Sequence, residues 1–397
     1  VSQNEKRDHI DGYYCLVSVK NARNFASVFA DQSVILSQDD KAKVSVGIPA
    51  IGRHFETMQT ILEPVSETDK SLRVVQLSIF IRAQWHLGSS FATHMTDILS
   101  LVSNKRFDGV FRCNDEVKPL WVLLVDGGPD ENLRHFKNIV QYCKLFCSLN
   151  LDYLTIRTHA LGQLAYNSVE RSMLSLSKKV AGITLPIDHF GNHLDSQGNV
   201  QDYELGLQNF HYAGQALADL WRRDLIYGKP VFAKYVDGQT NPFSNILSSI
   251  NENELENKKN EENSENNDDL SVAWSWIESH CNLYRYSLDI RKCNNLLCCS
   301  PKRAEEAVAL LSASNRFLPP LIKEKDGHYL NTIHTLEYFD SIKIPSYDAY
   351  LPSLSSENYV RHCKQPRSKS ATIEDFSMLS CSLGITDHEF IAIAVAL

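Results

Sequence analysis

The stretch Leu120–Asn132, LWVLLVDGGPDEN, combines a run of six apolar residues with an acidic turn. A short, continuous apolar run bounded by turn residues is typical of a strand that is buried on both faces of a sheet. Asp126 directly follows the run, and the Gly127–Pro129 turn after it predicts that its side chain is exposed above the end of the strand. The stretch therefore predicts an α/β fold with an acidic group at the edge of its sheet.

The sequence before this strand predicts further strands and a helix. Three β-rich runs, SVILSQ from Ser33, KVSVGI from Lys43 and RVVQLSIFIRA from Arg73, are separated by turn-rich or polar segments and predict a three-stranded meander. The apolar residues of the run that begins at Phe91 recur at helical spacing, so we expect a helix to lead into the strand that ends at Val125.

The sequence after this strand continues the alternation of helices and strands. Leu133–Leu149 and Asn167–Val180 carry the apolar stripe of helices, and Tyr153–Arg157 between them predicts a short strand. The expected order is therefore β, β, β, α, β, α, β, α, in which helices cover a mixed sheet. This succession matches an RNase H-like core.

Composition divides the rest of the chain. Tyr203–Asp224 is rich in helix formers, and KPVFAKYV from Lys229 predicts one more strand or an extended arm. Asn251–Asp269 is a low-complexity Asn/Glu run that is too polar to pack. The predicted regions are an N-terminal remnant at 1–31, the RNase H-like core at 32–183, a helical insertion or flank at 184–250, a disordered linker at 251–270 and a Cys-containing, loop-rich C-terminal module at 271–397.

Charge and apolar patterning limit the environment of the protein. The formal charge of −8 argues against a nucleic-acid partner, but Asn251–Asp269 has eight acidic residues and two lysines, a net −6, which leaves −2 for the rest. No run approaches the roughly 18 apolar residues of a membrane span, and no secretory signal is present. We therefore expect a soluble intracellular protein with reduced thiols. Because the first residue is Val, we also expect a fragment of a longer reading frame.

Four acidic residues fall where the predicted topology brings the ends of elements together. Asp39 and Asp40 end the first strand run, Asp126 follows the fourth strand, and Glu170 lies one turn into the last helix. Carboxylates from separate elements can hold two divalent cations about 4 Å apart, an arrangement that serves phosphodiester cleavage. Each acid taken singly is more often a turn, cap or helix-dipole residue, so the combination carries the prediction.

Three strings that contain these acids resemble the catalytic blocks of eukaryotic DDE transposases, which have an RNase H-like, integrase-like fold: QDDKAKVSVG (38–47), VLLVDGGPDEN (122–132) and AYNSVERSM (165–173). The resemblance covers about 150 residues, less than half of the chain. It implies cleavage and strand transfer of DNA with Mg²⁺ or Mn²⁺, and it implies nuclear residence. Asp39 or Asp40, Asp126 and Glu170 would occupy the first, second and third acidic positions. The implied partner is DNA, both transposon ends and target, and a homodimer is left open.

The choice between Asp39 and Asp40 stays open at this point. Asp39 is favoured because it comes immediately after the hydrophobic strand, and its neighbour would point to the opposite face. Basic residues near the same end of the predicted core are candidates for contacts to the DNA backbone, against the more common interpretation of a solvated face. They are Lys41, Lys43, Arg157, His159, Arg171, Lys178 and Lys179.

A second candidate metal site lies in SHCNLYRYSLDIRKCNNLLCC, Ser279–Cys299. Cys293 and Cys298 are separated by four residues, which is a spacing that structural zinc accepts, and Cys299 is adjacent. We take Cys281, Cys293, Cys298 and Cys299 as candidate zinc ligands, with free or partly buried thiols as the alternative. His280 lies upstream, and His328 or the His362/Cys363 pair could supply missing ligands.

Other classes of function compete with a nuclease. A transposon-derived protein that keeps the fold and binds DNA or another protein without cutting is the main alternative. An α/β hydrolase is disfavoured because the sequence contains no G-x-S-x-G nucleophile elbow. A nucleotide-binding P-loop is disfavoured because there is no GxxxxGK[ST] string.

Overall fold

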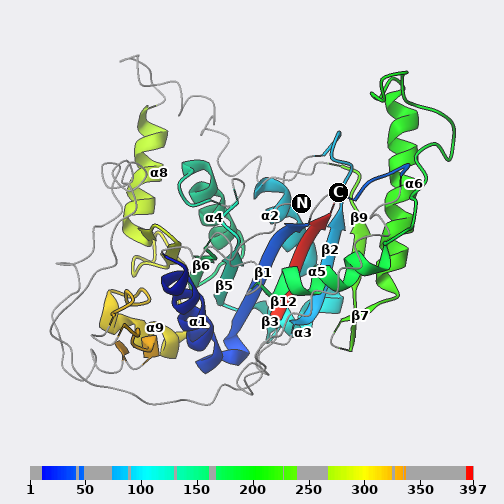
Figure 1. Cartoon of the computed structure of the whole chain (residues 1–397). Helices are drawn as coiled ribbons and strands as arrows, with labels where there is room; N and C mark the ends of the chain where they lie inside the picture. The colour runs from blue at the N-terminus through cyan, green and yellow to red at the C-terminus, as the bar shows by residue number, and fades with distance from the viewer. Residues whose placement is uncertain are drawn as a thin grey trace. The chain divides into compact units, whose positions relative to one another are not determined.

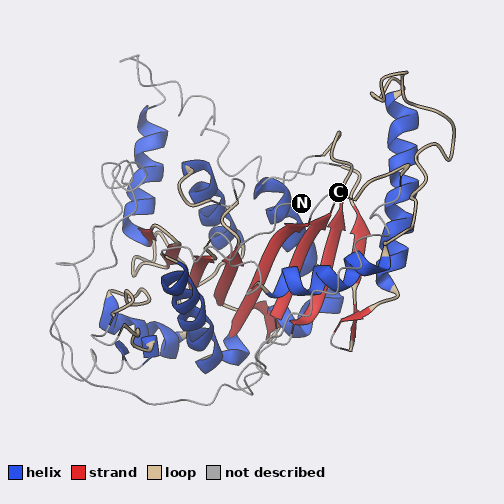
Figure 2. Cartoon of the chain, in the orientation of Figure 1, coloured by secondary structure: helices blue, strands red, loops and turns tan. Residues whose placement is uncertain are grey.

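The computed structural model describes most of the chain as helices, strands and connecting loops (Figures 1 and 2). The described residues are 11–41, 44–48, 74–87, 91–128, 132–160, 167–226, 228–238, 267–323, 327–333, 335–336 and 390–396. The chain divides into two compact units. The first unit comprises Val1–Ile35, Leu99–Gly162 and Asn241–Ile385, and the second comprises Leu36–Ile98, Gln163–Thr240 and Thr386–Leu397.

The first unit contains a mixed sheet with the strand order β10–β11–β6–β5. The two central apolar strands, β5 (Leu120–Val125) and β6 (Tyr153–Thr158), are parallel and buried along their whole length. β11 (Ser287–Arg291) pairs antiparallel with β6, and β10 (Cys281–Tyr284) pairs antiparallel with β11. A fully buried parallel pair requires cover on both faces.

Helices provide that cover in the first unit. α1 (Gly12–Val28) packs against β5 and β6, and Phe25 meets Tyr153 of β6 edge to face with the ring centroids 5.8 Å apart. The other elements of this unit are α3 (Asp108–Phe111), α4 (Phe136–Ser148), α8 (Asn267–His280), α9 (Glu305–Leu311), the short 3₁₀ turns Ala30–Gln32, Lys105–Phe107 and Ser312–Ser314, and the small hairpin of β3 (Arg112–Cys113) and β4 (Glu116–Val117).

The second unit has the strand order β1–β12–β2–β9. β12 (Phe390–Ala396) and β9 (Phe232–Tyr235) both pair parallel with β2 (Val74–Ile81). β1 (Ser33–Lys41) begins in the first unit and continues in the second from Leu36. β7 (Leu225–Ile226) and β8 (Lys229–Pro230) form a short antiparallel hairpin.

The core of the second unit lies between β2 and two helices, α5 (Ser168–Lys179) and α6 (Tyr203–Arg222). α2 (Phe91–Val102) begins in this unit. α6 runs beside β9 (Figure 1), and a Cβ at Gly214 would lie 2.1 Å from the Tyr235 ring, so the helix can approach the strand only because this residue is glycine. The core side chains include Leu77, Ile79, Ile81, Val169, Met173, Leu176, Leu217 and Trp221.

The α/β class predicted from the sequence is confirmed, with parallel and antiparallel pairs in one sheet. The predicted helices at 91–104, 133–149 and 167–180 and the predicted strands that begin at Ser33, Arg73, Leu120 and Tyr153 appear close to their expected positions. The predicted strand over 43–48 is wrong, because Val44–Ile48 lies in no strand. Val44 is buried in the second unit's core. The alternation of apolar residues in this segment therefore reflects side-chain packing and not pairing with another strand.

Two predicted regions contain regular elements that the sequence patterns did not predict. The N-terminal remnant contains α1, whose buried Cys15, Val19 and Ala22 follow helical spacing. The loop-rich C-terminal module contains β10 and β11, and the latter adds to β6 of the first unit. Residues 251–266 of the predicted linker lie outside the described part of the chain, and Asn267–Asp269 begin α8. Among the described residues, each helix is either too short or too polar to cross a membrane.

Candidate metal sites

The side chains that could hold a metal ion come together at the end of α8. His280 is the last residue of that helix, Cys293 follows β11, and Cys298 and Cys299 close the turn that comes next. The ligand atoms of these four residues lie within 4.8 Å of one another. This His/Cys cluster, defined as His280, Cys293, Cys298 and Cys299, belongs entirely to the first unit and could hold a metal ion.

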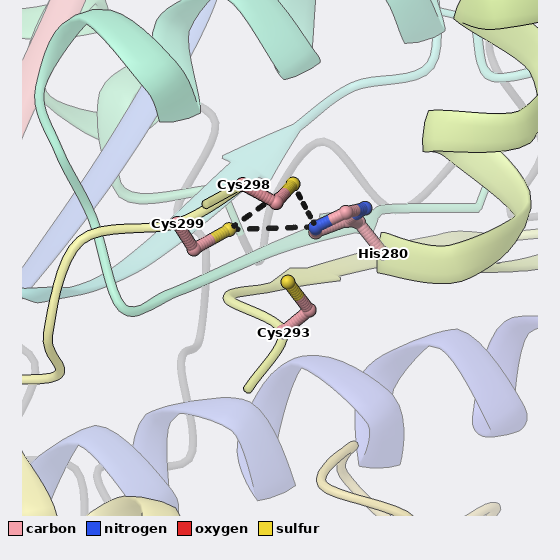
Figure 3. Close-up of side chains that lie close together, drawn as sticks. All are labelled: His280, Cys293, Cys298 and Cys299. Atoms are coloured by element: carbon pink, nitrogen blue, oxygen red, sulfur yellow. Dashed lines mark hydrogen bonds between the residues drawn. The ribbon is translucent and has the colours of Figure 1, made fainter. Parts of the chain in front are cut away.

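The four side chains of the His/Cys cluster point toward one another (Figure 3). His280 Nε2 lies 3.4 Å from the Sγ of Cys298 and 3.4 Å from the Sγ of Cys299. The two sulfur atoms are 3.9 Å apart. The nitrogen and sulfur lone pairs therefore meet in one small space, as they do in sites for soft or borderline cations.

Two neighbours fix the orientation of the His280 ring. Its Nδ1 lies 2.7 Å from the carbonyl oxygen of Trp276 and 2.7 Å from Ser279 Oγ. The ring also stacks on the Trp276 indole, with centroids 4.1 Å apart and planes 6° apart. Burial lowers the pKa of His280, which favours the neutral ring. A neutral imidazole that donates from Nδ1 presents an unprotonated Nε2 to the thiols.

The thiols of the cluster differ in burial. Cys299 is buried, and burial raises the pKa of its thiol to about 12. Burial also raises the pKa of the Cys298 thiol, although Cys298 is exposed. Cys293 is half-buried. Without a cation these two shifted thiols stay protonated at neutral pH, so a metal ion that binds them must displace their protons.

The predicted ligand set is corrected at one position. Cys281 is the first residue of β10 and points elsewhere, with its Sγ 3.7 Å from that of Cys143 on α4. His280, which precedes it, is the fourth member. His328 bonds to Tyr13 and is not in the cluster, whereas His362 and Cys363 lie outside the described residues. Strand geometry explains the difference, because neighbouring residues at a strand start face different ways.

Of the predicted carboxylate residues, Asp39 lies at the end of β1 and has a described side chain. Asp39 is 4% exposed, and its Oδ2 accepts a hydrogen bond of 3.0 Å from Asn167 Nδ2. Asn167 also accepts from Ser37 Oγ at 2.7 Å and from the backbone N–H of Val169 at 3.1 Å. Asn167 therefore caps the first turn of α5 and holds that turn beside the carboxyl end of β1.

The sequence interpretation did not single out Asn167. An asparagine immediately before an apolar helical pattern is a capping signal and could have identified it. Glu170 lies three positions after Asn167 in the same first turn, and the backbone of α5 therefore carries it close to Asp39. The side chains of Glu170 and Asp40 are outside the described part of the structure.

Asp126 directly follows β5 and is half-buried. Its Oδ1 accepts a 2.7 Å hydrogen bond from the backbone N–H of Gly128, which holds the carboxylate at the strand end. Gly127 has a φ of +77°, and a Cβ there would lie 2.4 Å from Cγ2 of Thr158, so only glycine fits this turn. Asp126 belongs to the first unit and Asp39 to the second, so the convergence of the carboxylates stays a prediction.

The donor chemistry of these acids suits a hard cation. Asp39 and Asp126 offer carboxylate oxygens that neighbouring N–H donors hold in place. Mg²⁺ and Mn²⁺ prefer oxygen ligands, and a site with few protein carboxylates is completed by water and substrate phosphate. The oxygen donors of Asp39 and Asp126 are of the type that such an ion prefers, whereas the nitrogen and sulfur donors of the His/Cys cluster suit a softer ion.

The structure disfavours two of the predicted DNA contacts. Arg157 lies on β6, is 7% exposed, and its Nη2 is 2.9 Å from Oδ1 and 3.2 Å from Oδ2 of Asp289 on β11. His159 is 3% exposed, and burial lowers its pKa to about 4. The Arg157 guanidinium is buried and ion-paired, and the His159 imidazole is buried and neutral. Neither side chain can contact a DNA phosphate without leaving its place in the fold.

Lys179 differs from these two residues, because its side chain is 57% exposed and its Nζ lies 3.0 Å from Asp224 Oδ1. It remains a candidate for DNA contact, since a surface ion pair of this kind is weak. The side chains of Lys41, Arg171 and Lys178 are outside the described part of the structure, as is the whole of Lys43.

In the comparison with known proteins, no family model, no curated protein and no solved structure matches the chain.

Proposed function

We propose that the protein is the catalytic core of a metal-dependent DNA transposase, with an RNase H-like fold and an Asp, Asp, Glu site. The observation that supports this most is the hydrogen bond from Asn167 to Asp39. It joins the end of β1 to the first turn of the helix that carries Glu170, and these are two of the three elements that the proposal requires. Asp126 directly follows a third element, β5, as the proposal also requires.

In this proposal Asp39, Asp126 and Glu170 hold Mg²⁺ or Mn²⁺. When bound, such ions activate the attacking oxygen and stabilise the leaving oxygen of a phosphodiester. Asn167 positions Asp39 by donating to Oδ2. The Gly127–Gly128 turn positions Asp126 in the same manner, since the Gly128 N–H occupies one lone pair of Oδ1 and fixes the direction of the others.

The proposed substrate and partner is duplex DNA, and the proposed location is the nucleus. Backbone phosphates would meet exposed basic side chains, of which Lys179 is the described example. Asp39 is favoured over Asp40 as the first acid, because Asp39 accepts from the α5 cap and successive residues of a strand face opposite ways.

The test is cleavage of a supercoiled plasmid by the purified chain with Mg²⁺, Mn²⁺ or no divalent cation. We expect nicking that depends on the cation and is abolished by Asp126→Asn. Asp219→Asn is the matched control, because Asp219 is an exposed acid on α6 whose Oδ1 pairs with Arg222. Nicking that persists in Asp126→Asn would contradict the proposal. Binding of DNA without cleavage under either cation would favour a transposon-derived protein that has lost catalysis.

A further inference from the structure

We propose that the His/Cys cluster binds a single zinc ion through four protein ligands, His280 Nε2 and the Sγ atoms of Cys293, Cys298 and Cys299, and that this ion is structural. The inference concerns a site separate from the proposed carboxylate centre and does not depend on nuclease function. It assigns the histidine at the end of α8 as the fourth ligand in place of Cys281.

The distances within the cluster match a tetrahedral zinc site. With Zn–S bonds of about 2.3 Å and a Zn–N bond of about 2.0 Å, a tetrahedral ion places two sulfurs about 3.8 Å apart and a nitrogen about 3.5 Å from each sulfur. The sulfurs of Cys298 and Cys299 are 3.9 Å apart, and His280 Nε2 is 3.4 Å from both. All four ligand atoms lie within 4.8 Å of one another, so one ion can reach them with small side-chain shifts.

His280 is oriented as a ligand by groups outside the cluster. Nδ1 faces the carbonyl oxygen of Trp276 at 2.7 Å, which requires the proton on Nδ1 and leaves the Nε2 lone pair directed at the thiols. Stacking on Trp276 fixes the plane of the ring. A histidine whose second nitrogen donates to a backbone carbonyl has the outer-shell partner that metal-bound histidines almost always have.

The loop that carries the cysteines is held by bonds that do not involve a metal. Before it, Lys292 Nζ forms a buried ion pair of 2.7 Å with Asp152 Oδ1. After it, Ser300 Oγ donates to Asn150 Oδ1 at 2.6 Å. Within it, the N–H groups of Cys298 and Cys299 both donate to the carbonyl oxygen of Asn295, at 3.0 and 2.9 Å. The three thiols are therefore presented together by an anchored turn.

Four protein ligands distinguish a structural zinc site from a catalytic one. A catalytic zinc ion keeps a coordination position for water or substrate, whereas four ligands close the tetrahedron. Thiolate and imidazole ligands select zinc over Mg²⁺ or Mn²⁺, which prefer oxygen. The ion would join the end of α8 to the loop after β11, and it would thereby fix the helix on the hairpin of the first unit.

The first measurement is metal content of the full chain purified without chelator, by mass spectrometry of the elements. We expect about one equivalent of zinc per chain. Replacement of zinc by Co²⁺ should give the intense visible absorption of tetrahedral thiolate coordination. Folded protein with no stoichiometric zinc, or a chromophore that contains iron in place of zinc, would overturn the proposal.

The variants separate the four proposed ligands from the neighbouring thiol. Cys299→Ser and Cys293→Ser should each weaken zinc binding by roughly 100-fold or more, since even second-shell changes cost 10-fold to 100-fold. Cys281→Ser is the matched control, because it removes a thiol beside His280 that lies outside the cluster. It should retain the full zinc content. Equal loss of zinc in Cys281→Ser and Cys299→Ser would overturn the ligand assignment.

A variant at His280 that keeps metal binding but changes the Co²⁺ spectrum distinguishes the loss of a ligand from misfolding. His280→Cys should keep tetrahedral Co²⁺ binding and shift the charge-transfer absorption, because a fourth thiolate replaces the imidazole. His280→Ala should lose it while the far-ultraviolet circular dichroism shows whether the helices persist. Unchanged Co²⁺ absorption in both variants would show that His280 is not a ligand.

Discussion

The His/Cys cluster and the proposed carboxylate site are two candidate metal sites of opposite construction. The four residues of the cluster fall within 20 consecutive positions, His280 to Cys299, and lie in one unit. The carboxylates Asp39 and Glu170 are 131 positions apart, and Asp126, which lies between them in sequence, belongs to the other unit. A site assembled by one helix end and one anchored loop needs only local structure, whereas a site assembled from three elements needs the whole fold.

The supporting groups of the two sites differ in the same way. His280 is oriented by Trp276, four residues earlier on its own helix. Asp39 is oriented by Asn167, which is 128 positions away. The first contact forms as soon as α8 forms, while the second requires β1 and α5 to pack. We therefore expect the carboxylate site to be the more sensitive of the two to changes elsewhere in the fold.

The largest expected effect concerns the two neighbouring acids at the end of β1. If Asp39 is the first acidic ligand, Asp39→Asn should reduce DNA cleavage by roughly 10⁴-fold, which is about 5 kcal/mol of activation free energy. Asp40→Asn is the matched control and should reduce it by less than about 10-fold, since successive residues of a strand face opposite ways. Cleavage rates with Mg²⁺ decide this. The reverse order of effects would move the site to Asp40.

The next largest effect tests Arg157 as a structural residue. Arg157→Met leaves the Asp289 carboxylate buried without its positively charged partner, and it should lower the free energy of unfolding by about 4 kcal/mol. The double variant Arg157→Met/Asp289→Leu should recover most of that loss, because it removes both charges. Urea unfolding measures both values. A loss of DNA affinity with unchanged stability would instead restore Arg157 as a phosphate contact.

The third effect is a loss of stability at acidic pH through His159. Both ring nitrogens lack a hydrogen-bond partner in the described structure, and burial, followed by the nearby Arg23 charge, lowers the pKa of His159 from 6.5 to about 4. Between these values the unfolded chain binds a proton that the folded chain does not. The free energy of unfolding is therefore unaffected by this group above pH 6.5. It falls by about 3 kcal/mol as the pH falls from 6.5 toward 4.

His159→Leu should flatten this part of the dependence of the unfolding free energy on pH. His211→Leu is the control, because His211 is exposed, with 48% of its side chain accessible, and pairs with Asp237 at the surface. The urea midpoint measured from pH 7 to pH 4 provides the comparison. A slope that is the same in His159→Leu and in the unsubstituted chain would show that His159 is not the group responsible.

The smallest effect on stability is expected at the cap of α5. Asn167→Ala removes the acceptor for the Val169 N–H and should cost about 1 kcal/mol of unfolding free energy. The same change removes the Asn167 donor to Asp39, so cleavage should fall by more than the change in stability explains. Asn167→Ser keeps a capping oxygen for the Val169 N–H but is too short to donate to Asp39, and it should retain most of the stability without restoring cleavage. Parallel recovery of both properties would separate Asn167 from the site.

Several elements could be predicted from the sequence because their patterns are strong and local. The apolar run Leu120–Val125 becomes the buried strand β5, and the stripe in Leu133–Leu149 becomes α4. α1 was missed although Cys15, Val19 and Ala22 recur at helical spacing, because serine and asparagine residues share its buried face. The cysteine pattern predicts three of the four cluster members, Cys293, Cys298 and Cys299. It predicts Cys281 as the fourth ligand in place of its neighbour His280.

The α/β class, the central strands and the segment that holds the thiols follow from local patterns of residues, since periodicity and short spacing are local properties. The pairing of β11 with β6, the ion pair between Arg157 and Asp289, and the hydrogen bond from Asn167 to Asp39 depend on how the chain packs. Each of these contacts joins residues more than 100 positions apart. The free energy of such contacts depends on which buried partner is available after packing, and no local pattern of residues contains that information.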